Sequence, residues 1–198
     1  SGLKGGYNGI AFGPDNRLYA GVSFREKFDP GGDPSPHAQS VISMTATGKN
    51  LKTVAEGLRQ PFQLYFPKGS KYPYVGVLGQ EKGKIPEDAI VVAKPGDDYG
   101  YPKCQFGFAS TCKGFTKPLI TLPKHASPMG ITSIGSTLYV SLFGGIGDGK
   151  PVVATLPVKG GKPKPFLTGF AAPVIALGQN AGKIYVGDLT GTIYAVDA

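Results

Sequence analysis

The chain has 198 residues, of which 31 are glycine and 18 are proline, while 40% are hydrophobic and only 17% are charged. This hydrophobic share excludes a disordered chain, and no apolar run approaches the roughly 18 residues that a membrane-spanning helix needs. The net charge of +8 comes almost wholly from scattered lysines, whereas nucleic-acid-binding proteins gather arginine and lysine on one face. We therefore expect an ordered, turn-rich, all-β protein that binds neither nucleic acid nor membrane, with weak attraction to acidic polysaccharide as the alternative.

A hairpin-like unit recurs four times along the chain. In each copy a short apolar run leads through a polar turn to β-branched and aromatic residues that include a tyrosine, which is the pattern of a β-hairpin. The four copies occupy residues 9–22, 62–77, 130–142 and 174–188. Their tyrosines mark equivalent places, and they are Tyr19, Tyr74, Tyr139 and Tyr185.

Further short strands are expected between the hairpins. They lie at about residues 40–44, 51–55, 89–93, 119–122, 152–156, 165–167 and 192–196. Repeats of four strands at this spacing indicate the blades of a β-propeller. We predict one all-β propeller domain or propeller fragment over residues 1–198, with four-stranded antiparallel blades at about 7–57, 58–123, 124–170 and 171–198. The last blade has three strands. A β-sandwich is the alternative, but it would not explain the even recurrence of hairpins.

The closure of the ring is the open point of this prediction. Propellers usually complete the last blade with a strand from the other terminus, which hides an edge. Residues 1–6 are too few and too rich in glycine for that role. One alternative is a small four-bladed ring with imperfect closure, and the other is a propeller that a missing N-terminal chain or a homo-oligomer completes.

The two cysteines, Cys104 and Cys112, lie eight residues apart in a loop rich in glycine, serine and phenylalanine. A short loop between strands can bring their Cα atoms within disulfide range, so we predict a disulfide, with two free thiols as the alternative. A disulfide favours an oxidising compartment, and this predicts a secreted, extracellular protein.

A series of short motifs runs along the chain in a fixed order. They are Gly-Pro-Asp at 13–15, Glu-Gly-Leu-Arg-Gln-Pro-Phe at 56–62, Gly-Asp-Asp-Tyr-Gly-Tyr-Pro at 96–102, Pro-Lys-His-Ala-Ser-Pro-Met-Gly at 123–130 and Phe-Leu-Thr-Gly-Phe at 166–170. In this order they resemble the glucose/sorbosone dehydrogenase family, the soluble pyrroloquinoline-quinone (PQQ)-dependent sugar dehydrogenases. The resemblance implies a six-bladed propeller, of which this chain would be about the C-terminal three-fifths.

The resemblance also implies a chemistry, in which a sugar is oxidised by hydride transfer to the quinone. A histidine acts as the base, calcium polarises the quinone, and arginines hold its carboxylates. Arg59 matches the cofactor-contacting arginine, and its alternative role is to tie loops together. The implied calcium ligands are the main-chain oxygens of Gly79 and Gln80, although nearby lysines would oppose a cation. His125 is the candidate catalytic residue, and its alternative is a packing histidine.

The sequence departs from the family at two expected positions. The stretch that should hold the catalytic histidine reads Lys-Gly-Gly-Tyr-Asn at 4–8, and the late arginine is replaced by Ala171-Ala172. Paired carboxylates at 87–88 and 97–98 fit strand edges and turns. The sequence therefore predicts either a sugar dehydrogenase that uses PQQ and calcium or a non-catalytic propeller that binds no cofactor. The latter would act as a scaffold for a sugar, a polysaccharide or another protein.

Overall fold

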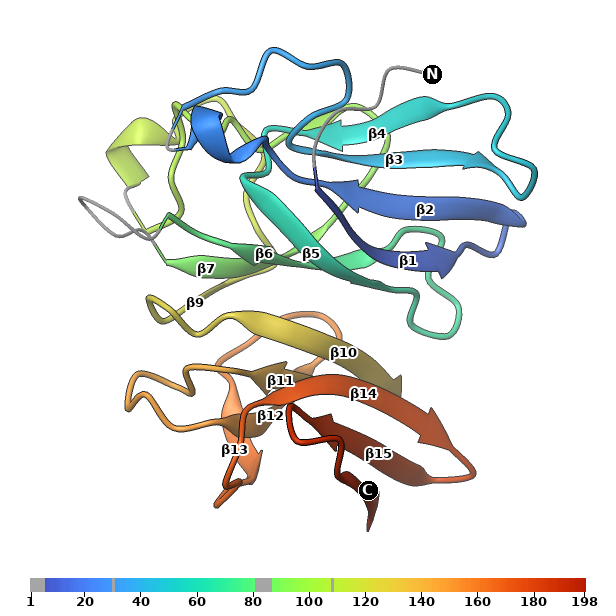
Figure 1. Cartoon of the computed structure of the whole chain (residues 1–198), viewed down its shortest axis with the longest axis vertical. Helices are drawn as coiled ribbons and strands as arrows, with labels where there is room; N and C mark the ends of the chain where they lie inside the picture. The colour runs from blue at the N-terminus through green and yellow to red at the C-terminus, as the bar shows by residue number, and fades with distance from the viewer. Residues whose placement is uncertain (1–5, 30, 81–86, 108) are drawn as a thin grey trace.

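The computed structural model describes residues 6–29, 31–80, 87–107 and 109–198 of the chain (Figure 1). Its strands are β1 (Tyr7–Phe12), β2 (Arg17–Val22), β3 (Ser40–Thr45), β4 (Lys52–Glu56), β5 (Gln60–Tyr65), β6 (Tyr74–Leu78), β7 (Asp88–Val92), β8 (Asp97–Asp98), β9 (Ile120–Leu122), β10 (Pro128–Ile134), β11 (Thr137–Leu142), β12 (Val152–Pro157), β13 (Lys164–Leu167), β14 (Val174–Asn180), β15 (Lys183–Asp188) and β16 (Ile193–Asp197). Two 3₁₀ turns, η1 (Glu26–Phe28) and η2 (Ala109–Thr111), lie in loops. The described residues contain no α-helix, and hence no helix of the length and hydrophobicity needed to span a membrane.

The strands form four separate sheets, each built as an antiparallel meander. Blade 1 runs β1-β2-β3-β4, blade 2 β5-β6-β7-β9, blade 3 β10-β11-β12-β13 and blade 4 β14-β15-β16. This arrangement confirms the predicted propeller of about four blades, including the three-stranded last blade. One pairing was not predicted: β8 joins the outer edge of blade 1, where Ala55 of β4 pairs in parallel with Asp97.

The hairpin turns use residues that tolerate a left-handed backbone. Ala181 and Gly182 connect β14 to β15 with φ angles of 47° and 79°, which is the geometry of a two-residue turn that matches the twist of the strands. Asn16 has a φ of 59° in the turn between β1 and β2, and asparagine accepts this conformation better than most residues. The turn chemistry therefore fixes the register of the hairpins that the sequence repeat indicates.

Successive blades pack face to face, and their apolar side chains form the core. β5 lies against β1 and β2, β10 lies against β5 and β6, and β14 lies against β10 and β11. One buried cluster joins blades 1 and 2, a second joins blades 2 and 3, and a third joins blades 3 and 4. Among the described strands, none of blade 4 makes more than a marginal contact with blade 1. The four blades thus form an open stack with two end faces (Figure 1).

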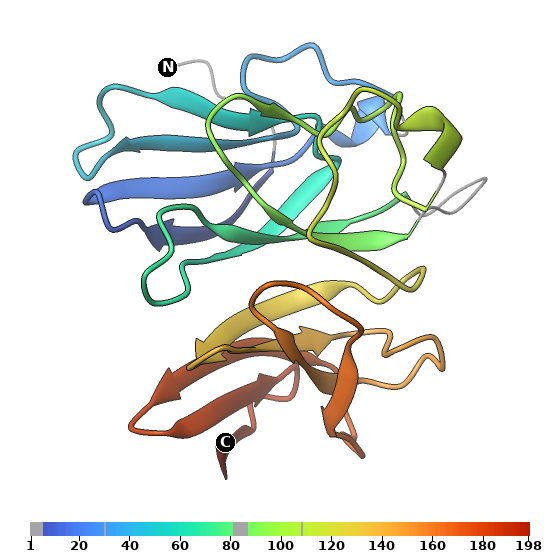
Figure 2. The same ribbon diagram turned by 180° about the vertical axis from the view of Figure 1, so that it is seen from behind.

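A long segment between β7 and β9 leaves blade 2 and then returns to it. Figure 2 shows this yellow-green segment running beside blade 1, where β8 pairs with β4 and the backbone N–H of Tyr99 donates to the oxygen of Glu56. Tyr99 is fully buried, and its hydroxyl donates to the oxygen of Val92 at 3.0 Å. The segment therefore fastens blade 2 to blade 1 in addition to their shared core.

Candidate functional site

The predicted site residues gather along one side of the blade stack, in the loops that enter blades 2 and 3 and the loop that follows β6. Arg59 lies in the connection from β4 to β5, and Gly79 and Gln80 follow β6. His125 lies between β9 and β10. Because Gln60 of β5 pairs with Leu78 of β6, the connections that carry these residues emerge on the same side.

Arg59 is almost completely buried and ties blade 1 to blade 2. Its Nε and Nη2 atoms donate to the two carboxylate oxygens of Asp29 at 3.0 and 2.8 Å, which is the fork geometry that suits a carboxylate. Its Nη1 donates to the carbonyl oxygen of Gly79, and the guanidinium lies 4.9 Å from the centre of the Phe24 ring. The groups that would hold a quinone carboxylate are thus engaged within the protein.

Tyr101 also contacts Asp29, the partner of Arg59. Its hydroxyl donates to Oδ1 of Asp29 at 3.5 Å. Burial of the phenol, followed by the negative charge of Asp29, raises the pKa of Tyr101 to about 12. A phenol with this pKa stays protonated at neutral pH and serves as a donor to Asp29, not as a base.

The cavity beside Arg59 is small. It is lined by Gly57, Arg59, Val77, Leu78, Gly79, Gln80, Glu87, Tyr101, Cys104, Gln105 and Phe106. Its volume of about 20 Å³ holds about one water molecule, whereas pockets for drug-sized ligands and cofactors span about 300–1,000 Å³. A tricyclic quinone does not fit this cavity.

Of the two predicted calcium ligands, the main-chain oxygen of Gly79 is engaged, and Gln80 is held through its side chain. The carbonyl oxygen of Gly79 accepts from Arg59, and a guanidinium next to that oxygen opposes a second cation. Gln80 is buried, and its Oε1 accepts from Nε2 of Gln105 at 3.1 Å. Residues 81–86 of the predicted calcium loop, with Lys82 and Lys84, lie outside the described residues. Within the described part of the chain, no three His, Cys, Asp or Glu residues gather as a metal site. As they lie, these residues do not fit PQQ and calcium.

Asp88 is a buried carboxylate that the sequence prediction treated as a strand edge. It accepts the backbone N–H of Gly79 and, at 2.6 Å, that of Ser127. Burial raises the pKa of Asp88, although both N–H donors and the nearby charges of His125 and Arg59 oppose this shift. The residue joins blade 2 to the loop that enters blade 3. The signal that could have found it is an acidic residue opening an otherwise apolar strand.

His125 is exposed beside this carboxylate and has a left-handed backbone with a φ of 58°. Its carbonyl oxygen lies where a side chain on Gly144 would be, so the two backbones approach closely. An exposed imidazole next to a buried carboxylate differs from a packing histidine. Its catalytic role stays a prediction.

The two positions where the sequence departs from the family carry no histidine and no arginine in the described residues. Tyr7 and Asn8 are described, while Lys4 and Gly5 lie outside the described residues. The Nδ2 of Asn8 donates to the oxygen of Pro61 at 3.1 Å. Ala172 is buried at the entrance to β14. These side chains cannot supply the base or the second cation that the resemblance implies.

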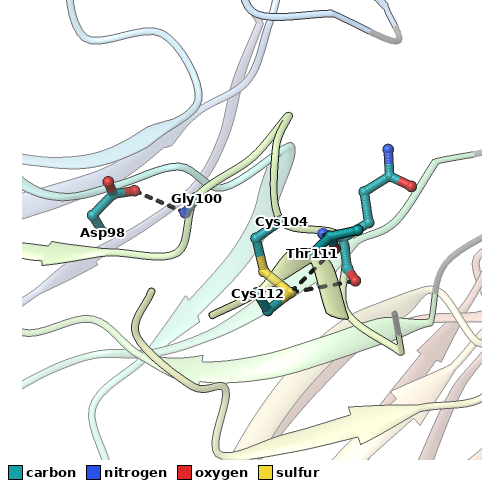
Figure 3. The surroundings of a disulfide bond; sticks show 6 residues. Asp98, Gly100, Cys104, Thr111 and Cys112 are labelled. Atoms are coloured by element: carbon teal, nitrogen blue, oxygen red, sulfur yellow. Dashed lines mark hydrogen bonds between the residues drawn. A yellow bond between two sulfur atoms is a disulfide. The ribbon is translucent and has the colours of Figure 1, made fainter. Parts of the chain in front are cut away.

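The predicted disulfide between Cys104 and Cys112 is confirmed (Figure 3). It closes the loop that follows Gly100, whose N–H donates to Oδ1 of Asp98 at 2.8 Å, and the Cα atoms of the two cysteines are 4.4 Å apart. The N–H of Gln105 donates to Oγ1 of Thr111 at 3.2 Å inside the loop. Cys104 lines the small cavity beside Arg59, so the cross-link helps to shape one wall of that cavity.

A larger, open groove lies on the other side of this loop. It runs between the disulfide loop and β9, and its volume is about 1,000 Å³. Phe106, Phe115 and Leu119 supply apolar surface, and the exposed Lys113 and Lys117 supply positive charge. In size and composition this groove can accept an organic ligand, in contrast to the small cavity beside Arg59.

No protein-family model matches the chain, and a search of curated proteins finds no similar sequence. Among solved structures, the chain has the propeller fold of soluble sugar dehydrogenases. The PQQ-bound aldose sugar dehydrogenase of Streptomyces coelicolor matches with a TM-score of 0.74 and 22% sequence identity, over 98% of this chain and 62% of its own. The soluble aldose sugar dehydrogenase of Escherichia coli, in its apo-form, gives 0.71 and 14% over 97% and 64%.

A third similar structure is a calcium structure of a Trichoderma reesei carbohydrate-active enzyme of family AA12. It has a TM-score of 0.75 and 12% identity, and the match covers 98% of this chain and 69% of that one. The chain spans less than two thirds of the Streptomyces and Escherichia proteins that it matches. At these identities the likeness establishes the fold.

Proposed function

We propose that this chain forms a four-bladed part of a secreted sugar dehydrogenase of the quinone-dependent type, which oxidises an aldose by transferring hydride to PQQ. The observation that carries the proposal is the match to a PQQ-bound aldose sugar dehydrogenase over 98% of the chain. Arg59 and Gly79, which the resemblance singles out, also lie on the same side of the stack as His125. The disulfide supports an oxidising compartment.

The described residues limit what this chain contributes to such a reaction. The fork of Arg59 is bound to Asp29, and the adjoining cavity of about 20 Å³ is too small for a quinone. We therefore derive no hydride-transfer step from them. The proposal assigns to this chain the propeller framework of the site, and it requires the pair of Arg59 and Asp29 to open before a cofactor carboxylate can bind.

The experiment follows from that requirement. Purified wild-type chain and the variant Asp29→Asn are titrated with PQQ in the presence of calcium, and the absorbance of the quinone is followed. Dye reduction with a panel of aldoses is then measured. We expect the wild type to shift the absorbance and to reduce dye slowly, because a missing base costs about 10²–10⁴-fold. Asp29→Asn should lower the dissociation constant for PQQ on the order of tenfold, since Arg59 loses its counter-charge.

Asp33→Asn is the matched control for this change. It breaks the ion pair of Arg25 and Asp33 in the same loop and leaves Arg59 untouched. This control should bind PQQ as the wild type does. If neither the wild type nor Asp29→Asn shifts the quinone absorbance or reduces dye, the dehydrogenase proposal is wrong.

The groove beside the disulfide loop favours a second candidate, a non-catalytic propeller that binds acidic carbohydrate. Aromatic and aliphatic side chains line it, and Lys113 and Lys117 attract carboxylate or sulfate groups. A glycan array should show salt-sensitive binding of acidic polysaccharide that Lys113→Ser combined with Lys117→Ser abolishes. Lys49→Ser, in an exposed turn of blade 1, should leave binding intact. Array signals no higher than background would contradict this candidate.

A further inference from the structure

Two hollows lie beside each other at the turns of blades 2 and 3. The first lies between the two blades, has a volume of about 440 Å³ and is lined in part by Lys68 of blade 2 and Lys159 of blade 3. The second lies on blade 3, has a volume of about 400 Å³ and is lined in part by Lys162 and Lys164. Ser136 and Pro157 line both hollows, so the two meet at the tip of blade 3. We call the surface of these residues the tip groove, and its members are Lys68, Ser136, Pro157, Lys159, Lys162 and Lys164.

The tip groove lies at the opposite end of the strands from the candidate site. β11 begins at Thr137, next to Ser136 of the groove, and ends at Leu142, beside the loop that carries His125. Blades 2 and 3 share a buried core, so the groove lies over an interface that the described residues themselves form. A ligand in the tip groove would therefore not compete with a ligand at Arg59 or His125.

The charged side chains of the tip groove are all positive. Its lysines are exposed, and they are Lys68, Lys159, Lys162 and Lys164. The ion pairs found among the described residues involve other side chains. No carboxylate of the described residues lines either hollow. The groove thus presents ammonium groups whose charge is not neutralised within the described part of the chain.

The described carboxylates of blades 2 and 3 lie at the far end of the strands. Glu87 and Asp88 stand where β7 begins, and the next residue of β7 pairs with Val77 near the end of β6. Asp148 lies in the loop between β11 and β12, and it is the single acidic residue of the sequence between positions 99 and 187. A hollow lined by one sign of charge raises the local concentration of ions of the other sign, so the tip groove should attract anions.

The neutral lining of the tip groove indicates which kind of anion fits. Thr137 and Thr155 line the second hollow together with Ser136, and their hydroxyls make no hydrogen bond within the described structure. These hydroxyls can donate to the oxygens of a ligand. No described aromatic ring lines either hollow, whereas Phe106 and Phe115 line the groove beside the disulfide loop. Because aromatic faces are what nucleobases stack on, the tip groove suits a chain that carries its charge on its backbone and has no ring to stack.

We propose that the tip groove binds a linear phosphate polymer, a class that includes inorganic polyphosphate and phosphodiester-linked polyols. The argument is charge complementarity, because lysine binds phosphate as a point charge and needs no planar fork. Each hollow has the size of a small-ligand site, and since the two meet, one chain can run through both and reach all the lysines. A short anion would contact the lysines of one hollow only. This surface is separate from the proposed dehydrogenase site and needs no cofactor.

Binding of this kind depends on salt and on the length of the polymer. The screening length falls from about 10 Å at 0.1 M salt to about 3 Å at 1 M. The dissociation constant of polyphosphate should therefore rise at least about tenfold between these two concentrations. Tripolyphosphate reaches one hollow only and should bind at least about tenfold more weakly than a long chain, which gains from several simultaneous contacts.

The test compares two variants that lose the same number of lysines and so keep the same net charge. The tip variant changes every lysine of the tip groove to serine. The matched control changes exposed lysines elsewhere, and it combines Lys49→Ser, Lys52→Ser, Lys103→Ser and Lys150→Ser. Fluorescence anisotropy of labelled polyphosphate measures the dissociation constant, which should rise at least about tenfold for the tip variant and less than about threefold for the control. Unchanged melting temperatures show that both variants are folded.

A second arm replaces polyphosphate with poly(glycerol phosphate), and the polymer that binds more tightly identifies the source of the phosphate groups. The proposal is overturned if the wild type binds neither polymer at about 0.1 M salt. It is equally overturned if the control weakens binding as much as the tip variant does, because the effect then reports net charge alone. Single-stranded DNA that binds as tightly as polyphosphate would also overturn it and would indicate a nucleic-acid surface.

Discussion

The interface between blades 1 and 2 and the outer face of blade 4 carry a tyrosine and a glycine in the same register, but among the described residues only the first is covered by another blade. Tyr19 is buried between blades, while Tyr185 remains accessible. The strands that carry them are equally regular, and each pairs on both sides within its own sheet. The residue pattern within a blade therefore specifies the strand, whereas the presence of a neighbouring blade determines whether an apolar side chain is buried in the core.

The largest effect is expected from truncating the same register position inside the stack, at Leu64, and on β1, at Ile10. Leu64→Ala removes a buried side chain between blades 1 and 2 and should cost about 2–5 kcal/mol of the free energy of unfolding. Ile10→Ala removes an exposed one and should cost within about 0.5 kcal/mol. Urea denaturation at low micromolar concentration measures both. Equal losses would show that Ile10 of β1 is as well packed as Leu64.

A second pair of variants probes the close approach of the blades. Gly21→Val places a side chain against the backbone oxygen of Pro61, which cannot yield as a flexible side chain would. Such overpacking costs about 1–3 kcal/mol, and in a domain of this size each kcal/mol lowers the melting temperature by about 2–4 °C. Gly187→Val has open space above it and should leave the melting temperature of dilute protein almost unchanged. A large loss for Gly187→Val would mean that another group already covers this face of blade 4.

The smallest expected difference concerns two ion pairs. The Asp33 side chain is fully buried and accepts from Arg25 and from the N–H of Ser35. Asp33→Asn should therefore cost about 1–3 kcal/mol. The pair of Lys183 and Asp197 on blade 4 is exposed to solvent, and Asp197→Asn should not change stability measurably. Chemical denaturation at neutral pH tests both variants.

The acid dependence of stability provides a second test of the ion pair between Arg25 and Asp33. The hydrogen bond from Arg25 holds the pKa of Asp33 well below its usual range. A carboxyl whose folded pKa lies below its unfolded value stabilises the fold above about pH 4, and that contribution is lost as the pH falls through the folded pKa. Asp33→Asn should therefore flatten the loss of stability below about pH 4. An unchanged acid limb would contradict this assignment.

The sequence predicted most of the fold because the signals for it are local. Alternating apolar residues and left-handed turn positions such as Asn16 and Gly182 define each hairpin within about 15 residues. The disulfide was also predictable, because its two cysteines lie only 8 residues apart in the sequence. The pairing of β8 with β4 was not predicted, because a two-residue parallel contact between different blades leaves no periodic signal in the chain.

The candidate site was less predictable for a physical reason. The position of Arg59 followed from a motif, but its role depends on Asp29, thirty residues away in the loop between β2 and β3. Asp88 is likewise defined by Ser127, thirty-nine residues away. Whether a charged side chain is available to a ligand depends on such distant partners, and no pattern in the sequence encodes them.

The packing of blade 4 on blade 3 alone, among the described residues, also bears on how this stack opens. A stack of repeats in which each unit contacts only adjacent units behaves as a one-dimensional array, so a terminal unit is held by one interface where an internal unit is held by two. Local unfolding should then begin with β14, β15 and β16, whose amide protons should exchange with solvent before those of β6 and β7. Blade 4, whose strands pack only on blade 3 in the described structure, is thus the place where this stack should open first.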